Sequence, residues 1–153
     1  MTEKQVRWLY ESNRHPEVGF YCEITGERYT QTPHLCHAVP VNEKGGDSSM
    51  TNIFLGSPMA NRWQDNKILF EWIIDPDGGR YWSTSERVKR LIKRLAEHKG
   101  CSIKELAKPY LTEKQLEDFC LIFETQKEVV QFPEWKEDEL GIRMIDVKVI
   151  EKR

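Results

Sequence analysis

The first half of the chain carries short β-prone runs separated by polar turns, and the second half carries helical periodicity. Runs of β-branched and aromatic residues that are bounded by turn signals predict short strands. The turn signals are Thr25-Gly26, which favours a hairpin-like entry, and the glycine-containing loop at 42–49. The predicted strands cover residues 20–23, 28–30, 34–41 and 52–55.

The sharpest helix start in the sequence is Gly56-Ser57-Pro58. Ser57 can accept hydrogen bonds from free backbone N–H groups and Pro58 suits the first helical position, so we expect a helix over 58–66. Capping boxes, in which a Ser or Thr precedes a Glu or Gln by three residues, predict three further helices. These boxes are Ser83 with Glu86, Ser102 with Glu105, and Thr112 with Gln115.

The overall pattern predicts an α+β fold in one compact unit. At 153 residues the chain is long enough for one domain with a substantial core. An emphatic turn at 75–79 divides the strand-rich part from the helical part. We therefore expect residues 1–79 to form the core with a short N-terminal amphipathic element. Residues 80–153 would form a helical extension that contains a basic helix and ends in a strand over 141–151.

Charge is distributed unevenly, although the formal net charge is only -2. Residues 80–108 contain nine Lys/Arg against three Glu, a local balance of +6. The basic helix in this segment is a candidate phosphate-binding surface, and a solvated helix face is the alternative. The helices after Gly100 carry acidic residues instead, which favours packing or contact with a protein partner there over insertion into a DNA groove. The candidate phosphate contacts on the basic helix are Arg87, Arg90, Lys93 and Arg94.

The sequence also indicates where in the cell the protein is expected to act. No apolar run approaches the roughly 20 residues that a membrane span needs, so we expect a soluble protein with no membrane contact. The N-terminus lacks the pattern of a secretory signal, and the four cysteines lack the spacing of a disulfide framework. A reducing, cytoplasmic location is the expectation.

One histidine and two asparagines are spaced as a small metal-dependent nuclease site requires. His37 ends a predicted strand, where an imidazole can act as a general base near neutral pH. Asn52 opens the next strand and can hydrogen-bond the loop that carries the histidine. Asn61 lies about one turn into the following helix, where its oxygen can face the pair as a metal ligand.

These residues resemble the HNH nucleases with their ββα-metal fold. The likeness covers about residues 20–70 and includes the Asn61-Arg62 pair and the Asp65-Asn66 pair, which are similar to the nicking domain of RNA-guided CRISPR effectors. The positions that match the family pattern are His37, Val39, Pro40, Gly45, Gly46, Asn52, Phe54, Leu55 and Asn61.

The resemblance implies an endonuclease that hydrolyses phosphodiester bonds with Mg²⁺ or Mn²⁺ and nicks nucleic acid, DNA being the expected substrate. It implies His37 as the general base, Asn52 as the residue that orients its loop, and Asn61 as a metal ligand. Arg62 would join the basic helix in contacting nucleic acid. Small enzymes of this kind are common in bacteriophages, so the resemblance also implies a bacterial or phage-infected cell.

Cys36 departs from the family, because a carboxylate or imidazole ligand normally precedes the catalytic histidine. A thiolate suits Zn²⁺ and is a poor partner for Mg²⁺. As a metal ligand Cys36 would point to zinc, with His34 on the same strand face as a second donor; the alternative is a buried apolar residue. Asp65 and Asn66 could supply a replacement oxygen ligand, or could simply solvate the helix end. Restoring the oxygen ligand with Cys36→Asp would then raise Mg²⁺-dependent activity.

Two other readings of the sequence stay open. The fold could be a catalytically silent HNH-like module that binds nucleic acid or protein, which the cysteine at position 36 favours. A zinc-binding interaction module could use Cys22, His34 and Cys36.

Overall fold

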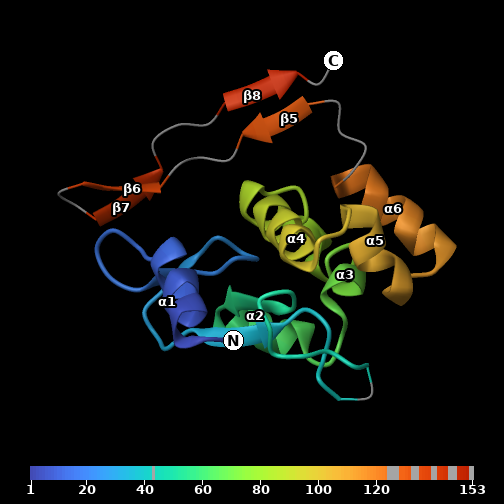
Figure 1. The fold of residues 1–153 in the computed structure, drawn as a ribbon, viewed down its shortest axis with the longest axis horizontal. Helices are drawn as coiled ribbons and strands as arrows, with labels where there is room; N and C mark the ends of the chain where they lie inside the picture. Colours follow the sequence, from blue (N-terminus) through green and yellow to red (C-terminus); the bar gives the residue numbers. More distant parts are fainter. Residues whose placement is uncertain (43, 124–127, 132–134, 139–140, 145–147, 152–153) are drawn as a thin grey trace.

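The computed structural model describes residues 1–42, 44–123, 128–131, 135–138, 141–144 and 148–151. It combines helices with small antiparallel strand pairs (Figure 1), so the prediction of a mixed α+β protein is confirmed. No helix in these residues is long and apolar enough to cross a membrane.

The N-terminal amphipathic element is a helix, α1 (Glu3–Ser12). A capping box begins it, because the Thr2 side chain accepts a hydrogen bond from the Gln5 backbone while the Gln5 side chain accepts one from the Thr2 backbone. Strands β1 (Phe20–Tyr21) and β2 (Arg28–Tyr29) follow and pair antiparallel around the Thr25-Gly26 turn. The predicted hairpin is therefore confirmed.

The centre of the fold is a second antiparallel pair followed directly by a helix. Strand β3 (His34–His37) pairs with β4 (Ile53–Gly56), and α2 (Pro58–Gln64) packs on both strands. Ser57 begins α2 as predicted, since its hydroxyl accepts a hydrogen bond from the Ala60 N–H at 3.1 Å.

The remaining helices pack around this centre. They are α3 (Leu69–Trp72), the 3-10 helix η1 (Gly79–Trp82), α4 (Glu86–Lys99), α5 (Ile103–Ala107), the 3-10 helix η2 (Lys108–Tyr110) and α6 (Glu113–Phe123). The capping boxes at Ser102 and Thr112 are both present.

The capping box predicted at Ser83 is wrong. Ser85 caps α4 instead, accepting from the Val88 N–H at 3.2 Å. The Ser83 hydroxyl donates to the Arg80 carbonyl and closes η1, a use of the side chain that the spacing to Glu86 does not reveal.

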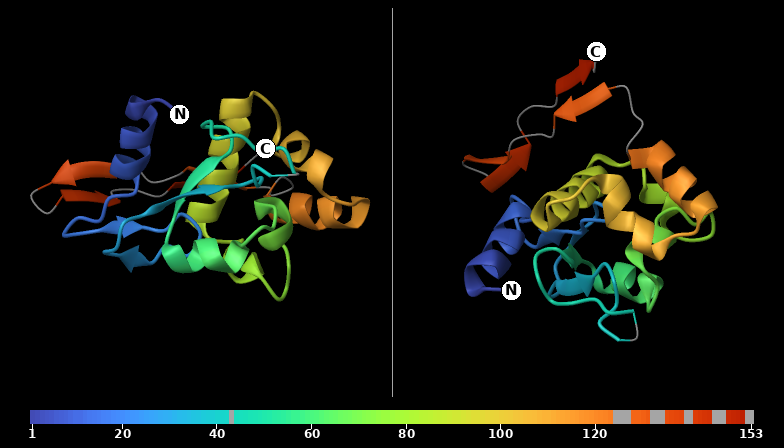
Figure 2. Two further views of the ribbon diagram at one scale, coloured as in Figure 1. Left: turned by 90° about the horizontal axis from the view of Figure 1, so that it is seen from below. Right: turned by 45° about the vertical axis from the view of Figure 1, so that its right-hand side comes forward.

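The two faces of the β3–β4 pair bury different clusters. The larger cluster runs without a break from the strand-rich part to the last described helix, and includes Cys36, Trp72, Leu91 and Phe119. The smaller one, made by Leu9, Ile53 and Leu55, holds α1 on the opposite face. Figure 2 shows α1 on the far side of the strands from α5 and α6. One main core thus spans residue 79, the position at which the sequence divides strands from helices.

The C-terminal part contains more strands than the one predicted over 141–151. Strand β5 (Glu128–Gln131) pairs with β8 (Lys148–Glu151), and β6 (Trp135–Asp138) pairs with β7 (Gly141–Met144), both antiparallel. Residues 145–147 of the predicted strand lie outside the described residues.

Candidate functional site

His37 is the last residue of β3, opposite Ile53 on β4, and its side chain is partly exposed. Its Nε2 lies 3.1 Å from the hydroxyl oxygen of Ser48, in the loop that joins the two strands. When the Ser48 hydroxyl donates this hydrogen bond, Nε2 carries the lone pair that a general base needs. The imidazole is thus accessible and held at the strand end.

The carboxylate of Asp47 belongs to the same loop. Hydrogen bonds from the Ser49 hydroxyl and backbone N–H lower the pKa of Asp47, and the charges of Lys99 and His37 act in the same direction. Asp47 therefore stays ionised, and its charge interacts with that of His37. The sequence reasoning did not include this carboxylate.

Asn52 makes the hydrogen bonds predicted for it. Its Oδ1 accepts from the Val39 N–H at 2.7 Å, and its Nδ2 donates to the carbonyls of Val39 and Asp47, each at 2.8 Å. The side chain is buried, so these bonds replace water for both polar groups of Val39. Asn52 thereby connects Val39, two residues after His37, to Asp47 in the loop between β3 and β4.

Gly46 is required by this closure. A Cβ at position 46 would lie 1.7 Å from the Val39 carbonyl oxygen, whereas one at Gly45 would meet nothing within 4 Å. The Gly46 N–H also donates to the Pro40 carbonyl at 2.8 Å. Of the two consecutive glycines, only Gly46 needs to lack a side chain for steric reasons, because this lets the loop pack against the segment after β3.

Gln64 is a site residue that the sequence reasoning missed. It is buried at the end of α2, and its Nε2 donates to the His37 carbonyl at 2.9 Å and to the Lys67 carbonyl at 3.1 Å. The backbone of His37 is thus fixed to the helix. Helical spacing could have identified Gln64 in the sequence. It lies three residues after Asn61 and therefore on the same face of the helix, which packs on the strands.

Cys36 points to the other face of β3, into the main core, and is almost fully buried. Burial raises the pKa of its thiol to about 12, with smaller contributions from Cys22 and Glu23. The thiol is therefore neutral at physiological pH in the metal-free protein. Of the two alternatives for Cys36, the structure favours the buried apolar residue.

Asn61 also lies away from His37. Its Nδ2 is 3.0 Å from Nδ1 of His34, at the opposite end of β3. Side chains three positions apart in a strand point to opposite faces, and their Cα atoms are about 10 Å apart. The structure therefore groups Asn61 with His34, and the predicted grouping of Asn61 with His37 and Cys36 is not formed. Periodicity in the sequence places Asn61 on a helix but does not say which end of the strand it meets.

The other candidate ligands do not assemble either. Asp65 is exposed and follows α2 with a positive φ of 51°, and the Asn66 carbonyl accepts from the Lys44 ammonium at 2.6 Å. Within the residues that the structure describes, no three His, Cys, Asp or Glu side chains form a group that could hold a metal ion. Because Cys36 points into the main core and Asn61 meets His34, these two residues do not fit a metal ion that is shared with His37, as the resemblance requires.

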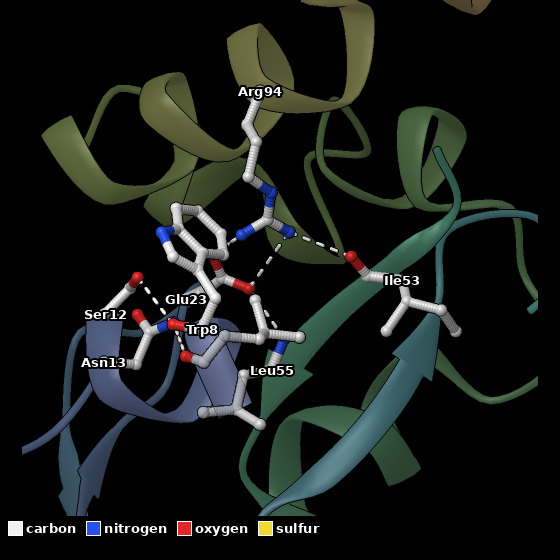
Figure 3. A network of polar contacts seen from close by, with 8 residues as sticks. Trp8, Ser12, Asn13, Glu23, Ile53, Leu55 and Arg94 are labelled. Carbon is white, nitrogen blue, oxygen red and sulfur yellow. Dashed lines mark hydrogen bonds and ion pairs between the residues drawn. The ribbon is translucent and has the colours of Figure 1, made fainter. Parts of the chain in front are cut away.

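Some of the basic side chains of α4 pack against the protein and do not face solvent. Arg94 donates to the Glu23 carboxylate at 2.6 Å and to the Ile53 carbonyl at 2.8 Å, and its guanidinium lies over the ring of Trp8 (Figure 3). The Glu23 carboxylate in turn accepts from the Leu55 N–H. Arg94 joins α1, β4 and α4, and its side chain is 10% exposed, so it lies against the protein and not on the solvent-facing side of the helix.

The side chains of Arg87 and Arg90 are also partly buried. The Arg87 guanidinium lies 4.1 Å from the centre of the Tyr21 ring, and burial lowers its pKa to about 10. Burial likewise lowers the pKa of Arg90. Lys93 and Arg62 are exposed, so these two keep the surface position that was predicted for all five basic residues.

No protein-family model, curated protein or solved structure matches the chain.

Proposed function

We propose that the chain is an endonuclease that hydrolyses phosphodiester bonds in DNA, with His37 as the general base. The observation that carries the proposal is the partly exposed imidazole of His37 at the end of β3, with Nε2 turned to a hydroxyl and the backbone fixed on both sides. Such an enzyme would act in the cytoplasm of a bacterial or phage-infected cell.

In this proposal a water molecule replaces the Ser48 hydroxyl as the donor to Nε2, and Nε2 takes its proton as the water oxygen attacks phosphorus; the imidazolium later returns that proton to solvent. The bond from phosphorus to the leaving sugar oxygen then breaks, and that oxygen takes a proton from solvent. Asn52 and Gln64 act as positioning residues, because they hold the carbonyls of Val39 and His37 and so fix the direction of the imidazole. A monomer with one such site would nick one strand at a time.

The resemblance implies Mg²⁺ or Mn²⁺ for this chemistry, and Zn²⁺ for a thiolate ligand, but Cys36 and Asn61 do not fit such an ion. We therefore assign no metal ligand and no metal-dependent step to these two residues. The burial of Cys36 also changes the outcome expected for Cys36→Asp. That substitution would place a carboxylate among apolar side chains, so we expect loss of stability in place of a gain in activity.

The second candidate is a catalytically silent HNH-like module that binds nucleic acid or protein. Two observations favour it, the neutral buried thiol of Cys36 and the pairing of Asn61 with His34. In this reading the hairpin and its Asn52 bonds serve as a scaffold, and His37 has no chemical task.

The experiment that separates the two candidates is nicking of supercoiled plasmid in the presence of Mg²⁺, Mn²⁺, Zn²⁺ or EDTA. His37→Ala is the test variant, and His98→Ala, at an exposed position on α4, is the matched control. Nicking that is lost in His37→Ala and retained in His98→Ala supports the endonuclease. Absence of cleavage under every condition by correctly folded protein supports the silent module.

A further inference from the structure

Three aromatic rings from two separate segments stack at the surface. Trp63 of α2 lies parallel to Trp82 of η1, with ring centroids 5.4 Å apart and an interplanar angle of 22°. Tyr81 meets the same Trp82 ring edge-on at 5.7 Å and 88°. We call Trp63, Tyr81 and Trp82 the aromatic platform. Neither its stacking nor its location follows from the HNH-like motif.

The platform is unusually exposed for rings of this size. Tyr81 is 85% exposed, although large aromatic side chains are normally half-buried or more, and Trp63 is 49% exposed. Trp63 keeps about half of its surface exposed although Trp82 stacks on one face of its ring. The platform thus presents flat apolar surface that the described residues leave uncovered.

The backbone beneath the platform is fixed. The turn that leads into η1 packs flat on Trp72, because a Cβ at Gly78 or Gly79 would lie 3.0 Å or 2.9 Å from the Trp72 ring. The buried hydroxyl of Ser83 donates to the Arg80 carbonyl at 2.8 Å and closes the 3-10 turn. Trp72 also contacts Trp82, with ring centroids 5.9 Å apart. The rings are therefore held in place before any ligand arrives, which lowers the ordering cost of binding.

Each of the two segments that form the platform also carries an exposed arginine next to an aromatic residue in sequence. Arg62 precedes Trp63 and Arg80 precedes Tyr81, and both arginines are exposed. The ion pairs found among the described side chains involve neither of them. Carboxylates also occur nearby in sequence, at Asp65, Asp75 and Asp77, so the surface is not uniformly positive. This mixture suits a ligand that combines flat rings with sparse negative charge better than the dense phosphate charge of a duplex.

We propose that the aromatic platform binds single-stranded nucleic acid, with bases stacked on Trp63 and Tyr81 and phosphates beside Arg62 and Arg80. Stacking on aromatic side chains tolerates any base and requires unpaired bases. The inference rests on the proposed function in one respect, since it makes an unpaired strand the substrate that the nuclease site receives. The platform itself would bind single strands with or without catalysis.

The test uses the full chain carrying His37→Ala, so that bound nucleic acid is not cleaved. Fluorescence anisotropy would measure the affinity for a labelled mixed-sequence single-stranded DNA and for the same sequence as a duplex. We expect the single strand to bind more tightly, and Tyr81→Ala or Trp63→Ala to weaken its binding roughly ten-fold each. Quenching of tryptophan fluorescence by the strand should accompany binding, and it should decrease in Trp63→Ala.

Matched variants separate stacking from charge and from general surface effects. Val18→Ala removes an exposed apolar side chain away from the platform and should leave the affinity unchanged. Arg62→Ala and Arg80→Ala should weaken binding and reduce its salt dependence, while Arg7→Ala, on exposed α1, should do neither.

Several results would overturn the proposal. Equal affinity of the Tyr81→Ala variant and its parent for the single strand would exclude stacking on that ring. Tighter binding of the duplex, or no binding of the single strand, would exclude an unpaired-strand ligand. A concentration-dependent dimer that disappears in Tyr81→Ala would identify the platform as a self-contact. Because the assay measures binding, loss of plasmid nicking alone would refute only the proposed catalytic function.

Discussion

Replacing Arg94 by Ala should cost the protein a large part of its stability. Arg94 and Glu23 have side chains that are 10% and 9% exposed, with a 2.6 Å contact between them. Removing one partner of a buried ion pair leaves an unpaired buried charge, which typically costs about 3–5 kcal/mol. The Glu23 carboxylate would keep its bond from the Leu55 N–H, while the Ile53 carbonyl would lose its donor. We therefore expect a free energy of unfolding lowered by about 3–5 kcal/mol.

Urea unfolding followed by tryptophan fluorescence would measure this loss. The neighbouring variant Lys93→Ala is the matched control, because Lys93 is 51% exposed and its ammonium lies 3.9 Å from the exposed carboxylate of Glu97. Exposed pairs of this kind contribute about 0.3–0.5 kcal/mol. A double variant, Arg94→Met with Glu23→Gln, should be more stable than Arg94→Ala, because it leaves no unpaired charge.

The reasoning about Arg94 fails if Arg94→Ala is as stable as Lys93→Ala. In that case the contact with Glu23 would not contribute to the free energy of unfolding, and Arg94 could again be counted among the residues that contact nucleic acid. If the expected loss is found, any weakened binding in Arg94→Ala has to be measured at temperatures where the variant is folded.

Three further predictions concern the loop and the strand around His37. Asn52→Ala removes three hydrogen bonds and leaves the buried Val39 N–H without its acceptor, so the free energy of unfolding should fall by about 2–4 kcal/mol and amide exchange at Val39 should accelerate. Gly46→Ala should prevent the loop from closing on Val39, whereas Gly45→Ala, at φ +76° with open space around it, should cost only about 1 kcal/mol; equal losses in urea unfolding would contradict this. The pKa of the Cys36 thiol is raised to about 12, so folding favours the neutral form, and stability should decrease as pH rises above the ordinary thiol range towards that value. Thiol labelling at Cys36 should accordingly be slow until the protein unfolds, and fast labelling of folded protein would show that the position is open.

Local signals in the sequence predict much of the scaffold. The helix start at Ser57, the capping boxes at Ser102 and Thr112, and the hairpin around Thr25-Gly26 are all present. Each depends on interactions within a few residues, so the local sequence contains the information. The hydrogen bonds from Asn52 to the segment after His37 were also predictable, because the motif spacing fixes the length of the loop between them.

Other features depend on contacts between distant segments. Arg94 looks like one more cation on a basic helix, and only its meeting with Glu23, 71 positions away, turns it inward. The aromatic platform likewise requires α2 and η1 to lie side by side, which no pattern within either segment indicates. Ser83 and Ser85 are both candidates to cap the N-terminus of α4. Ser85 caps it, because the Ser83 hydroxyl bonds to the Arg80 carbonyl of η1.

The two faces of β3 explain why the consecutive residues Cys36 and His37 lie in different surroundings. His37 lies on the face that opens to the loop, and its neighbours Ser48 and Asp47 belong to that loop. Cys36, one position earlier, must then point to the main core, where a carboxylate would be costly and a small neutral thiol packs well. The same alternation that keeps the base accessible therefore buries the preceding side chain. On the His37 side of the strand, the ionised group whose charge acts on the imidazole is the Asp47 carboxylate, and the Cys36 side chain lies on the other side.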